Sequence, residues 1–290
     1  QLATLIARLK ADGHTIIIAE HRLSFLSGIA DRVYCFDKGN IALTATGEEF
    51  YATSDEERKQ LGLRSLVPVP MPQLPQPAED GLAISNLTFA YRHGNTVLNI
   101  SHLLFPAEKI TALLGPCGSG KSTLARIICG LEKAKGASIT LNGQKFASRD
   151  AYLVMQDPTR QLFSDTVIDE VTLGTTKAEK QHIDAHAILE ELDLADHESD
   201  HPQALSGGQR QRLVIATALA ANKKVYIFDE PTSGVGYKHL VAISRVMRKL
   251  ADTGAVVIVI THDAELVTEV ADHSVRLDQI NACSDMCLQE

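Results

Sequence analysis

A glycine-rich segment followed by Lys, Ser and Thr is the clearest chemical feature of the 290-residue sequence. It follows the apolar stretch 110–114 and precedes a helix that we expect over 124–130. Glycines let backbone N–H groups approach phosphate oxygens closely, and a helix N-terminus adds a favourable dipole. The pattern predicts an ATP-phosphate site in which Lys121 reaches the β- and γ-phosphates and Ser122 binds Mg²⁺. The expected phosphate-binding residues are Gly115, Pro116, Cys117, Gly118, Ser119, Gly120, Lys121, Ser122 and Thr123.

A pair of carboxylates follows a second apolar stretch, 225–228. Ligands of doubly wound sheets lie at the carboxyl ends of the strands, so we expect Asp229 and Glu230 at that edge. Asp229 is suited to complete the Mg²⁺ shell begun by Ser122. Glu230, one residue further on, would point the other way and could orient or deprotonate an attacking water molecule.

A second glycine-rich helix start, Leu205-Ser-Gly-Gly-Gln, precedes a helix that we expect over 213–221. It would form another anion-binding helix N-terminus, and one domain does not need two. With this motif the sequence resembles the ATP-binding-cassette (ABC) family, whose signature reads Leu-Ser-Gly-Gly-Gln. The resemblance implies that two such domains dimerise head to tail. Each signature then closes on the ATP of the other domain, here through Ser206, Gly207, Gly208 and Gln209.

The same resemblance assigns roles to further residues. Tyr91 stands where the family stacks an aromatic ring on adenine, and His262 matches the histidine that contacts the γ-phosphate. Gln156 matches the glutamine that touches Mg²⁺ and senses the membrane partner. The implied catalytic residues are therefore Glu230, His262 and Gln156. Gly236 stands where the family usually carries Asp, so communication across the dimer could differ here.

The resemblance also implies the elements that position these residues. Residues 81–290 should form a complete ABC ATPase domain, a P-loop NTPase with a RecA-like α/β core, an antiparallel β subdomain and a helical subdomain. Residues 2–40 align with 243–281, and both copies contain an all-apolar stretch that predicts a buried strand, Ile16–Ala19 and Val256–Ile260. Residues 1–62 are accordingly predicted to be the C-terminal fragment of a first ABC domain that is truncated at its N-terminus.

A proline-rich linker is predicted over 63–80, because five of the ten prolines lie between Val67 and Pro77. Such a composition favours an extended, semi-rigid spacer between the two domains. The alternative reading is a ligand for an SH3-type domain, but a tether between duplicated domains needs no additional partner.

Charge and hydropathy restrict the functional classes. The formal net charge of -8 would repel nucleic-acid phosphates, so we expect no nucleic-acid partner. The apolar runs are shorter than the roughly 20 residues that cross a bilayer. Any membrane role should therefore go through a partner protein. His182, His186, His197 and His201 lie in an acidic stretch, for which a solvated helix face is the expectation.

The segment Gln156–Val171 resembles the ATPases of energy-coupling-factor importers, which take up vitamins and metal ions such as cobalt. That likeness implies a peripheral protein at the cytoplasmic face of the membrane. The region Gln156–Val167 would form a groove for a transmembrane component, with Leu162 and Phe163 kept exposed. A soluble tandem cassette acting on ribosomes is the alternative, although those proteins usually join their domains through a long charged helical arm. Cassettes of DNA repair would need coiled-coil heptads, which this sequence lacks.

Overall fold

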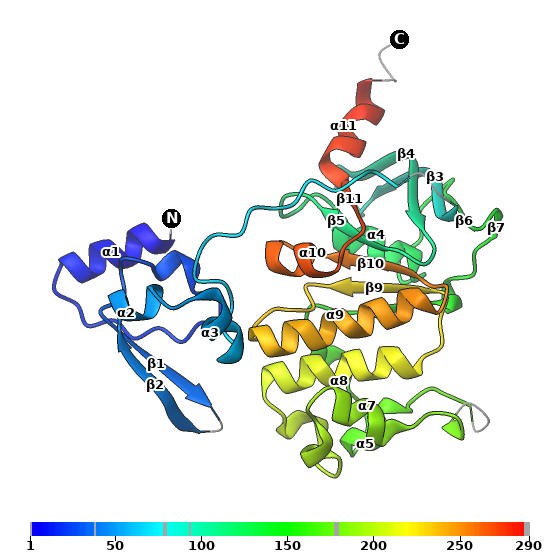
Figure 1. The fold of residues 1–290 in the computed structure, drawn as a ribbon. Helices are drawn as coiled ribbons and strands as arrows, with labels where there is room; N and C mark the ends of the chain where they lie inside the picture. The colour runs from blue at the N-terminus through cyan, green and yellow to red at the C-terminus, as the bar shows by residue number, and fades with distance from the viewer. Residues whose placement is uncertain (1, 38, 78–79, 93, 177–179, 287–290) are drawn as a thin grey trace. The chain divides into compact units, whose positions relative to one another are not determined.

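The computed structural model describes residues 2–37, 39–77, 80–92, 94–176 and 180–286. The chain divides into two compact units (Figure 1). The first unit comprises residues 1–70 together with 234–240, and the second comprises 71–233 and 241–290. The boundary at residue 70 falls inside the segment predicted as a linker. Among the described residues, no helix is long and apolar enough to cross a membrane.

A parallel sheet of five strands forms the centre of the second unit, in the order β11-β5-β10-β9-β8. Three of its strands are buried along their whole length, because helices cover both faces and apolar side chains are needed on each side. The strands are β5 (Ile110–Leu114), β8 (Ala151–Val154), β9 (Val225–Asp229), β10 (Val256–Ile260) and β11 (His273–Arg276).

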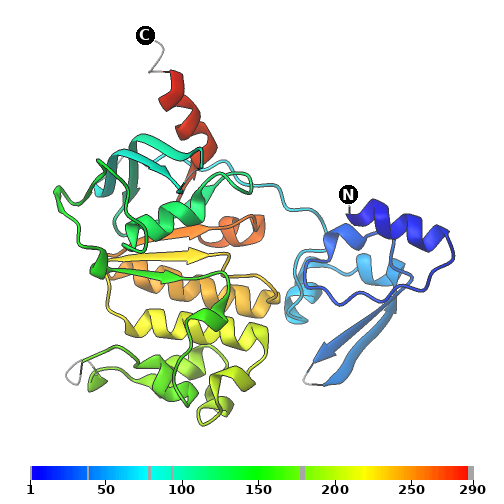
Figure 2. The same ribbon diagram turned by 180° about the vertical axis from the view of Figure 1, so that it is seen from behind.

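Helices lie on both faces of this sheet. Figure 1 shows α9 (Tyr237–Asp252) in front of the strands, and the reversed view in Figure 2 brings α4 (Lys121–Ile128) to the front. Helix α10 (Ala264–Val270) follows β10, and its N-cap residue Asp263 accepts a side-chain hydrogen bond from the N–H of Leu266. This arrangement is the α/β core that the sequence predicts.

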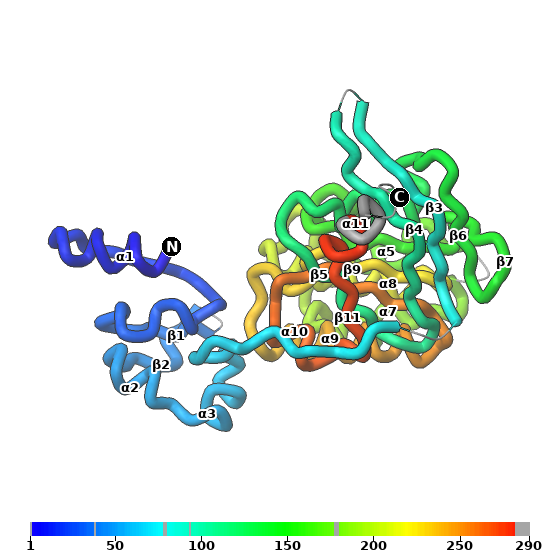
Figure 3. The backbone as a smooth tube through the Cα atoms, turned by 90° about the horizontal axis from the view of Figure 1, so that it is seen from above, coloured from blue at the N-terminus to red at the C-terminus, as the bar shows by residue number. Residues whose placement is uncertain are grey.

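An antiparallel sheet in the order β4-β3-β6-β7 forms the second layer. Figure 3 shows β3 (Gly81–Ala90) and β4 (Thr96–Pro106) running side by side as a long hairpin. The two shorter strands are β6 (Ser138–Leu141) and β7 (Gln144–Lys145). The C-terminal helix α11 (Leu277–Met286) lies against β4, where the side-chain amide of Asn281 accepts the Asn99 N–H at 3.2 Å and donates to the Val97 carbonyl at 3.4 Å.

A helical subdomain between β8 and β9 completes the second unit. Its long helix α8 (Gly207–Ala220) packs against α5 (Val167–Val171) and α7 (Ala185–Glu191). Two short 3-10 turns, η4 (Ala195–His197) and η5 (Pro202–Ala204), lie between α7 and α8, and η3 (Pro158–Arg160) lies between β8 and α5. A further turn, η2 (Ser148–Asp150), directly precedes β8. His197 therefore lies in a short turn and not on the regular, solvated helix face that the sequence suggested.

The proline-rich segment is attached to the second unit over part of its length. The Ser274 N–H donates to the Pro75 carbonyl at 3.2 Å, and the Ser274 hydroxyl donates to the Leu74 carbonyl at 3.4 Å. Ser274 belongs to β11, the edge strand of the parallel sheet, so this contact partly covers that edge. Residues 74–75 of the predicted semi-rigid spacer are therefore hydrogen-bonded to the second unit.

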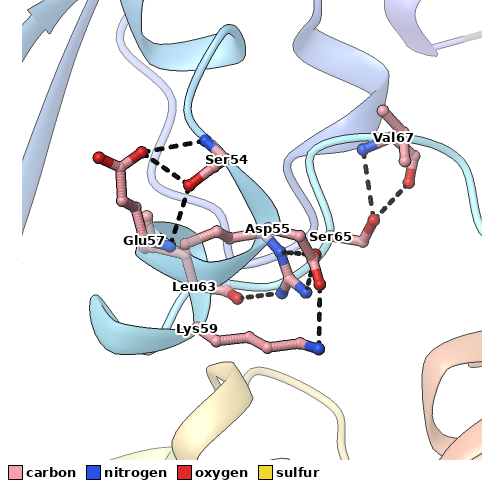
Figure 4. Close-up of polar contacts among 8 residues, drawn as sticks. Ser54, Asp55, Glu57, Lys59, Leu63, Ser65 and Val67 are labelled. Atoms are coloured by element: carbon pink, nitrogen blue, oxygen red, sulfur yellow. Dashed lines mark hydrogen bonds and ion pairs between the residues drawn. The ribbon is translucent and has the colours of Figure 1, made fainter.

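The first unit is small and built from local elements: α1 (Leu2–Ala11), η1 (Ser24–Leu26), β1 (Arg32–Asp37), β2 (Asn40–Thr46), α2 (Gly47–Tyr51) and α3 (Asp55–Gln60). The strands β1 and β2 form an antiparallel hairpin. Ser54 and Glu57 form a capping box at the start of α3, and Asp55 pairs with Lys59 one turn on, as Figure 4 shows.

One expectation about the repeated segment is wrong. Residues 16–19 form no strand, and Ile17 is 94% exposed whereas the aligned Ile258 of β10 is 1% exposed. A buried parallel strand needs neighbours to accept its hydrogen bonds, and β10 has two, whereas the described residues of the first unit provide none for 16–19. Residues 277–281 begin α11, whereas the aligned residues Phe36 and Asp37 end β1 and Asn40 begins β2.

Candidate functional site

Residues of the predicted site follow four neighbouring strands of the parallel sheet, at the same edge. The glycine-rich loop follows β5, Glu230 follows β9, His262 follows β10 and Gln156 follows β8. All these strands pair in parallel, and Asp229 at the end of β9 lies in register with Ile260 at the end of β10. The carboxyl ends therefore meet at one edge, where ligands of such sheets bind.

The glycine-rich loop requires glycine at several points. Gly118 and Gly120 have φ angles of 81° and 95°, in the left-handed region that disfavours side chains. A Cβ atom at Gly120 would also lie 2.6 Å from Leu98 Cδ2. The loop closes on Lys121, whose ammonium is buried and donates to the Gly115 and Pro116 carbonyls at 2.7 and 2.9 Å. The loop thus brings a buried cation to the start of α4.

The start of α4 suits an anion. Gly120 occupies the N-cap position, and no side chain of the described residues caps the first turn. The N-terminal N–H groups of a helix need acceptors, and phosphate oxygens can supply them. The nearby Ser119 hydroxyl is buried with no hydrogen-bond partner among the described residues. These residues fit a bound nucleotide phosphate.

Asp229 is a buried carboxylate close to Ser122 and Lys121. Burial raises the pKa of Asp229 above its ordinary value, and this effect exceeds the opposing influence of a hydrogen bond from Ser122 and of the charges on Lys121 and Arg126. A buried carboxylate is destabilised unless it is paired or coordinates a metal. The Ser122–Asp229 pair therefore fits the predicted Mg²⁺ position, since hydroxyl and carboxylate oxygens are ligands that Mg²⁺ accepts.

Glu230 occupies an unusual backbone position. Its φ angle is 50°, in a region that residues with a side chain rarely adopt, and its N–H donates to the Ile260 carbonyl at 2.8 Å. One carboxylate oxygen accepts a hydrogen bond from the Thr261 hydroxyl at 3.1 Å. The other lies 3.9 Å from His262 Nε2. The backbone turn thus brings together the two residues expected to act near the γ-phosphate.

Tyr91 lies beside the phosphate-binding loop. It follows β3 in the loop of the β3–β4 hairpin, and its hydroxyl lies 3.0 Å from the Thr123 hydroxyl. Its ring packs edge-on against Phe89, with 5.0 Å between the centroids, and the residue is 40% exposed. A partly exposed aromatic face next to the loop is compatible with the expected contact to adenine.

The segment after Gln156 is tied back to the sheet. The Gln161 side-chain amide accepts the Met155 N–H and donates to the Leu153 carbonyl, both at 2.6 Å. It extends the end of β8 much as a neighbouring strand would. Gln156, which is exposed, thus lies at the start of a short loop that the Gln161 side chain closes.

Phe163 and Leu162 differ in exposure. Phe163 is 75% exposed, as predicted, but Leu162 is only 5% exposed and belongs to the core, because side chains of adjacent residues point in different directions here. The buried carboxylate of Glu170 accepts the Phe163 and Ser164 N–H groups at 2.7 and 2.6 Å and so fixes the loop. The sequence analysis missed Glu170. Its only signal was an acidic residue, beside Asp169, among the apolar residues of a short helix.

The signature residues form the N-terminus of α8. Ser206 is the N-cap of this helix, and its hydroxyl accepts the Gln209 N–H, while the Gln209 side chain accepts the Ser206 N–H in return. Gly207 and Gly208 complete the first turn. The described side-chain hydrogen bonds of Ser206 and Gln209 go to one another and to His197, and none joins the phosphate-binding loop. Gly236 lies directly before α9.

The sequence is similar to known ABC transporter proteins. The family model described as ABC transporter matches residues 98–233. An ABC transporter ATP-binding protein of Treponema denticola is 35% identical over 300 residues, covering 99% of this chain and 61% of the relative. One from Methanosarcina acetivorans is 30% identical and covers 97% of this chain and 56% of the relative. The chain thus spans little more than half of these curated relatives.

Solved structures show the same fold. CbiO1 of Clostridium perfringens, described as part of the ABC transporter complex CbiONQ, is 27% identical with a TM-score of 0.58, covering 68% of this chain and 85% of that one. A bacterial Atm1-family ABC exporter, 24% identical with a TM-score of 0.59, covers 77% of this chain and 41% of its own and shares the fold. The predicted fold class is confirmed. The chain therefore carries an ATPase domain of the ABC transporter family, which includes residues 98–233.

Proposed function

We propose that the chain is part of an ATP-hydrolysing component that powers a membrane importer of the energy-coupling-factor type, with a vitamin or metal ion as cargo. The protein would lie at the cytoplasmic face of the membrane and contact a transmembrane component through the surface around Gln156–Val167. The observation that carries the proposal is Phe163, a large apolar residue that is 75% exposed and whose backbone N–H donates to the Glu170 carboxylate. Such a residue is typical of a binding surface.

ATP with Mg²⁺ would bind at the edge of the parallel sheet. Lys121 and the start of α4 would hold the phosphates, and Ser122, Asp229 and Gln156 would hold the metal. Mg²⁺ neutralises charge that develops on the phosphates during transfer. Glu230 would orient and deprotonate water, and the hydrogen bond from the Thr261 hydroxyl would keep its carboxylate in position. The signature at Ser206–Gln209 would close on the nucleotide of a second ABC domain in a head-to-tail dimer.

The type of importer rests on a likeness. CbiO1 is part of a transporter complex, and it is 27% identical to this chain over an alignment that covers 68% of this chain. The segment 156–171 supplies the local resemblance, and the structure gives it an apolar residue exposed at a fixed position. Together these observations favour a membrane partner over a ribosomal one.

Two substitutions test the ATPase chemistry. Lys121→Ala should abolish ATP binding, because it removes the buried cation at the loop. Glu230→Gln should retain binding and lose hydrolysis by several orders of magnitude, since the amide cannot accept a proton. Binding of a fluorescent ATP analogue and phosphate release are the measurements. Equal loss of binding in both variants would remove Glu230 from its assigned role.

One further substitution tests the partner. Phe163→Asp should leave ATP binding near wild type, because the phosphate site is untouched, but should prevent co-purification with a transmembrane component. A charge that enters an apolar interface costs about 2 kcal/mol or more. Leu131→Asp is a matched control, since Leu131 is 57% exposed and follows α4 elsewhere on the domain. Recovery of the same membrane protein in equal yield by Phe163→Asp contradicts the surface assignment, and recovery of ribosomes by wild type supports the soluble alternative.

A further inference from the structure

A chain of hydrogen bonds leads from an acidic turn to the signature helix. The Asp200 carboxylate lies 2.7 Å from His197 Nδ1, and His197 Nε2 lies 2.7 Å from the side-chain nitrogen of Gln209. The Gln209 oxygen, in turn, accepts the Ser206 N–H at 2.8 Å. Four residues thus form a continuous path of hydrogen bonds that ends at Ser206, the N-cap of α8.

The directions of these hydrogen bonds follow from their chemistry. A backbone N–H can only donate, so the Ser206 N–H fixes the Gln209 oxygen as the acceptor and leaves the amide nitrogen to donate. His197 Nε2 must then accept, which places the ring proton on Nδ1. That proton is donated to Asp200, whose carboxylate can only accept. Asp200 therefore selects the tautomer of His197 that binds Gln209, just as a buried Asp orients the histidine of a catalytic triad.

The same acidic turn is attached to the helix that presents Phe163. The Val167 N–H donates to the Asp200 carbonyl at 3.0 Å, and the Ile168 N–H donates to the Glu198 carbonyl at 3.1 Å. Both donors belong to the first turn of α5, and Glu170 of that helix holds the Phe163 loop. The turn that carries His197 is thus bonded to α5 on one side and to α8 on the other.

We propose that His197, oriented by Asp200, is a positioning residue that holds the signature at Gln209 and Ser206 in the geometry that receives the opposing ATP. The inference rests on the proposed nucleotide role of the signature. A capping box alone fixes the Gln209 oxygen and leaves its amide nitrogen free to seek water. His197 supplies the missing acceptor, so the first turn of α8 is ordered before the two ABC domains close, and less entropy is lost on closure.

The test compares three variants in the complete protein. His197→Phe keeps a planar ring and removes the acceptor, whereas His197→Gln places an amide oxygen within reach of Gln209. Asp200→Asn can donate to Nδ1 and so move the ring proton to Nε2, where it opposes the Gln209 amide. We expect His197→Phe and Asp200→Asn to raise the MgATP concentration for half-maximal hydrolysis by about three- to tenfold, the effect of one hydrogen bond. His197→Gln should restore the wild-type value.

A positioning role and a purely structural role predict different results. If His197 positions the signature, binding of a fluorescent ATP analogue at the Lys121 loop and the thermal unfolding temperature should be unchanged in all three variants, because the turn lies outside the phosphate loop. If His197 is purely structural, the variants should lower the thermal unfolding temperature. Adding Asp200→Asn to His197→Gln should have no further effect, since no imidazole remains to be oriented. Equal defects in His197→Phe and His197→Gln, or wild-type behaviour of His197→Phe, would overturn the inference.

Failure of the proposed function can be recognised separately. If wild type hydrolyses ATP but recovers no membrane protein, the importer proposal fails and the three variants still test His197. If wild type does not hydrolyse ATP, ATP-dependent association of two ABC domains replaces hydrolysis as the readout, measured by sedimentation in the Glu230→Gln background. The same order of the variants is then expected in the MgATP concentration for half-maximal association. Identical association curves for all variants would overturn the inference.

Discussion

Replacement of Glu170 should loosen the loop that presents Phe163. The carboxylate is 1% exposed, and one of its oxygens accepts the N–H groups of Phe163 and Ser164. Hydrogen bonds to a charged acceptor contribute about 1.5–3 kcal/mol each, so Glu170→Ala should lower the free energy of unfolding by up to about 3–6 kcal/mol. Glu170→Gln keeps an oxygen for both donors and loses only the charge assistance, which roughly halves the strength of each bond. Its expected loss is therefore smaller, about 1–3 kcal/mol.

Urea unfolding and hydrogen exchange together measure this effect. Unfolding gives the free-energy difference, and exchange at the Phe163 and Ser164 amides shows whether the loss is local. Asp165→Asn is the control, because Asp165 lies exposed in the same loop and the substitution removes the same charge. Faster exchange at both amides in Glu170→Ala, with Asp165→Asn unchanged, is expected. Equal unfolding free energies and equal exchange in wild type and Glu170→Ala would refute the reasoning.

Three other predictions concern the phosphate site and the half-buried Asp272. The exposed thiol of Cys117 in the phosphate loop should react with a maleimide, and MgATP should protect it; labelling that ignores ATP would place the thiol away from the phosphates. Asp229→Asn should raise the thermal stability of the nucleotide-free protein, because it removes a buried carboxylate whose pKa is raised. In the presence of ATP, the same substitution should abolish the further rise in thermal stability of the protein that Mg²⁺ causes. For Asp272, burial acts to raise the pKa, but hydrogen bonds from Arg248 and from a backbone N–H outweigh it and lower the pKa below 3.8. The native state thus favours the ionised form, so the stability advantage of wild type over Asp272→Asn should be constant near neutral pH and decline as the pH falls through 3.8, as urea unfolding across that range can check.

The fold of the second unit was largely predictable because its strands are short apolar runs, each followed by the polar or charged residues expected at a nucleotide site. The predicted strands at 110–114 and 256–260 have the bounds that the structure gives. The first unit was less predictable. Residues 16–19 carry the same apolar pattern as β10, but a pattern records which side chains favour burial and not whether neighbouring strands are present.

The candidate site shows the same distinction. Backbone-driven features, such as the glycine-rich loop and the capped start of α8, can be recognised because the residue types have few alternative uses. Residues that act through tertiary hydrogen bonds cannot. His197 lies in an acidic stretch where a solvated face is the reasonable expectation, and only its contact with Gln209 distinguishes it. Glu170 is likewise distinguished only by the hydrogen bonds that it accepts from Phe163 and Ser164. Leu162 was misassigned because exposure alternates between adjacent residues.

Asn281 has a consequence for aggregation. β4 is an outer strand of the antiparallel sheet and spans Thr96–Pro106, long enough to template pairing with another chain. The Asn281 amide bonds the Asn99 N–H and the Val97 carbonyl, which are backbone groups of β4, so one side chain imitates a neighbouring strand. Helix α11 thereby blocks that edge. A preparation shortened before Leu277 would present a bare strand edge and should form intermolecular sheets at concentrations where the longer chain stays dispersed.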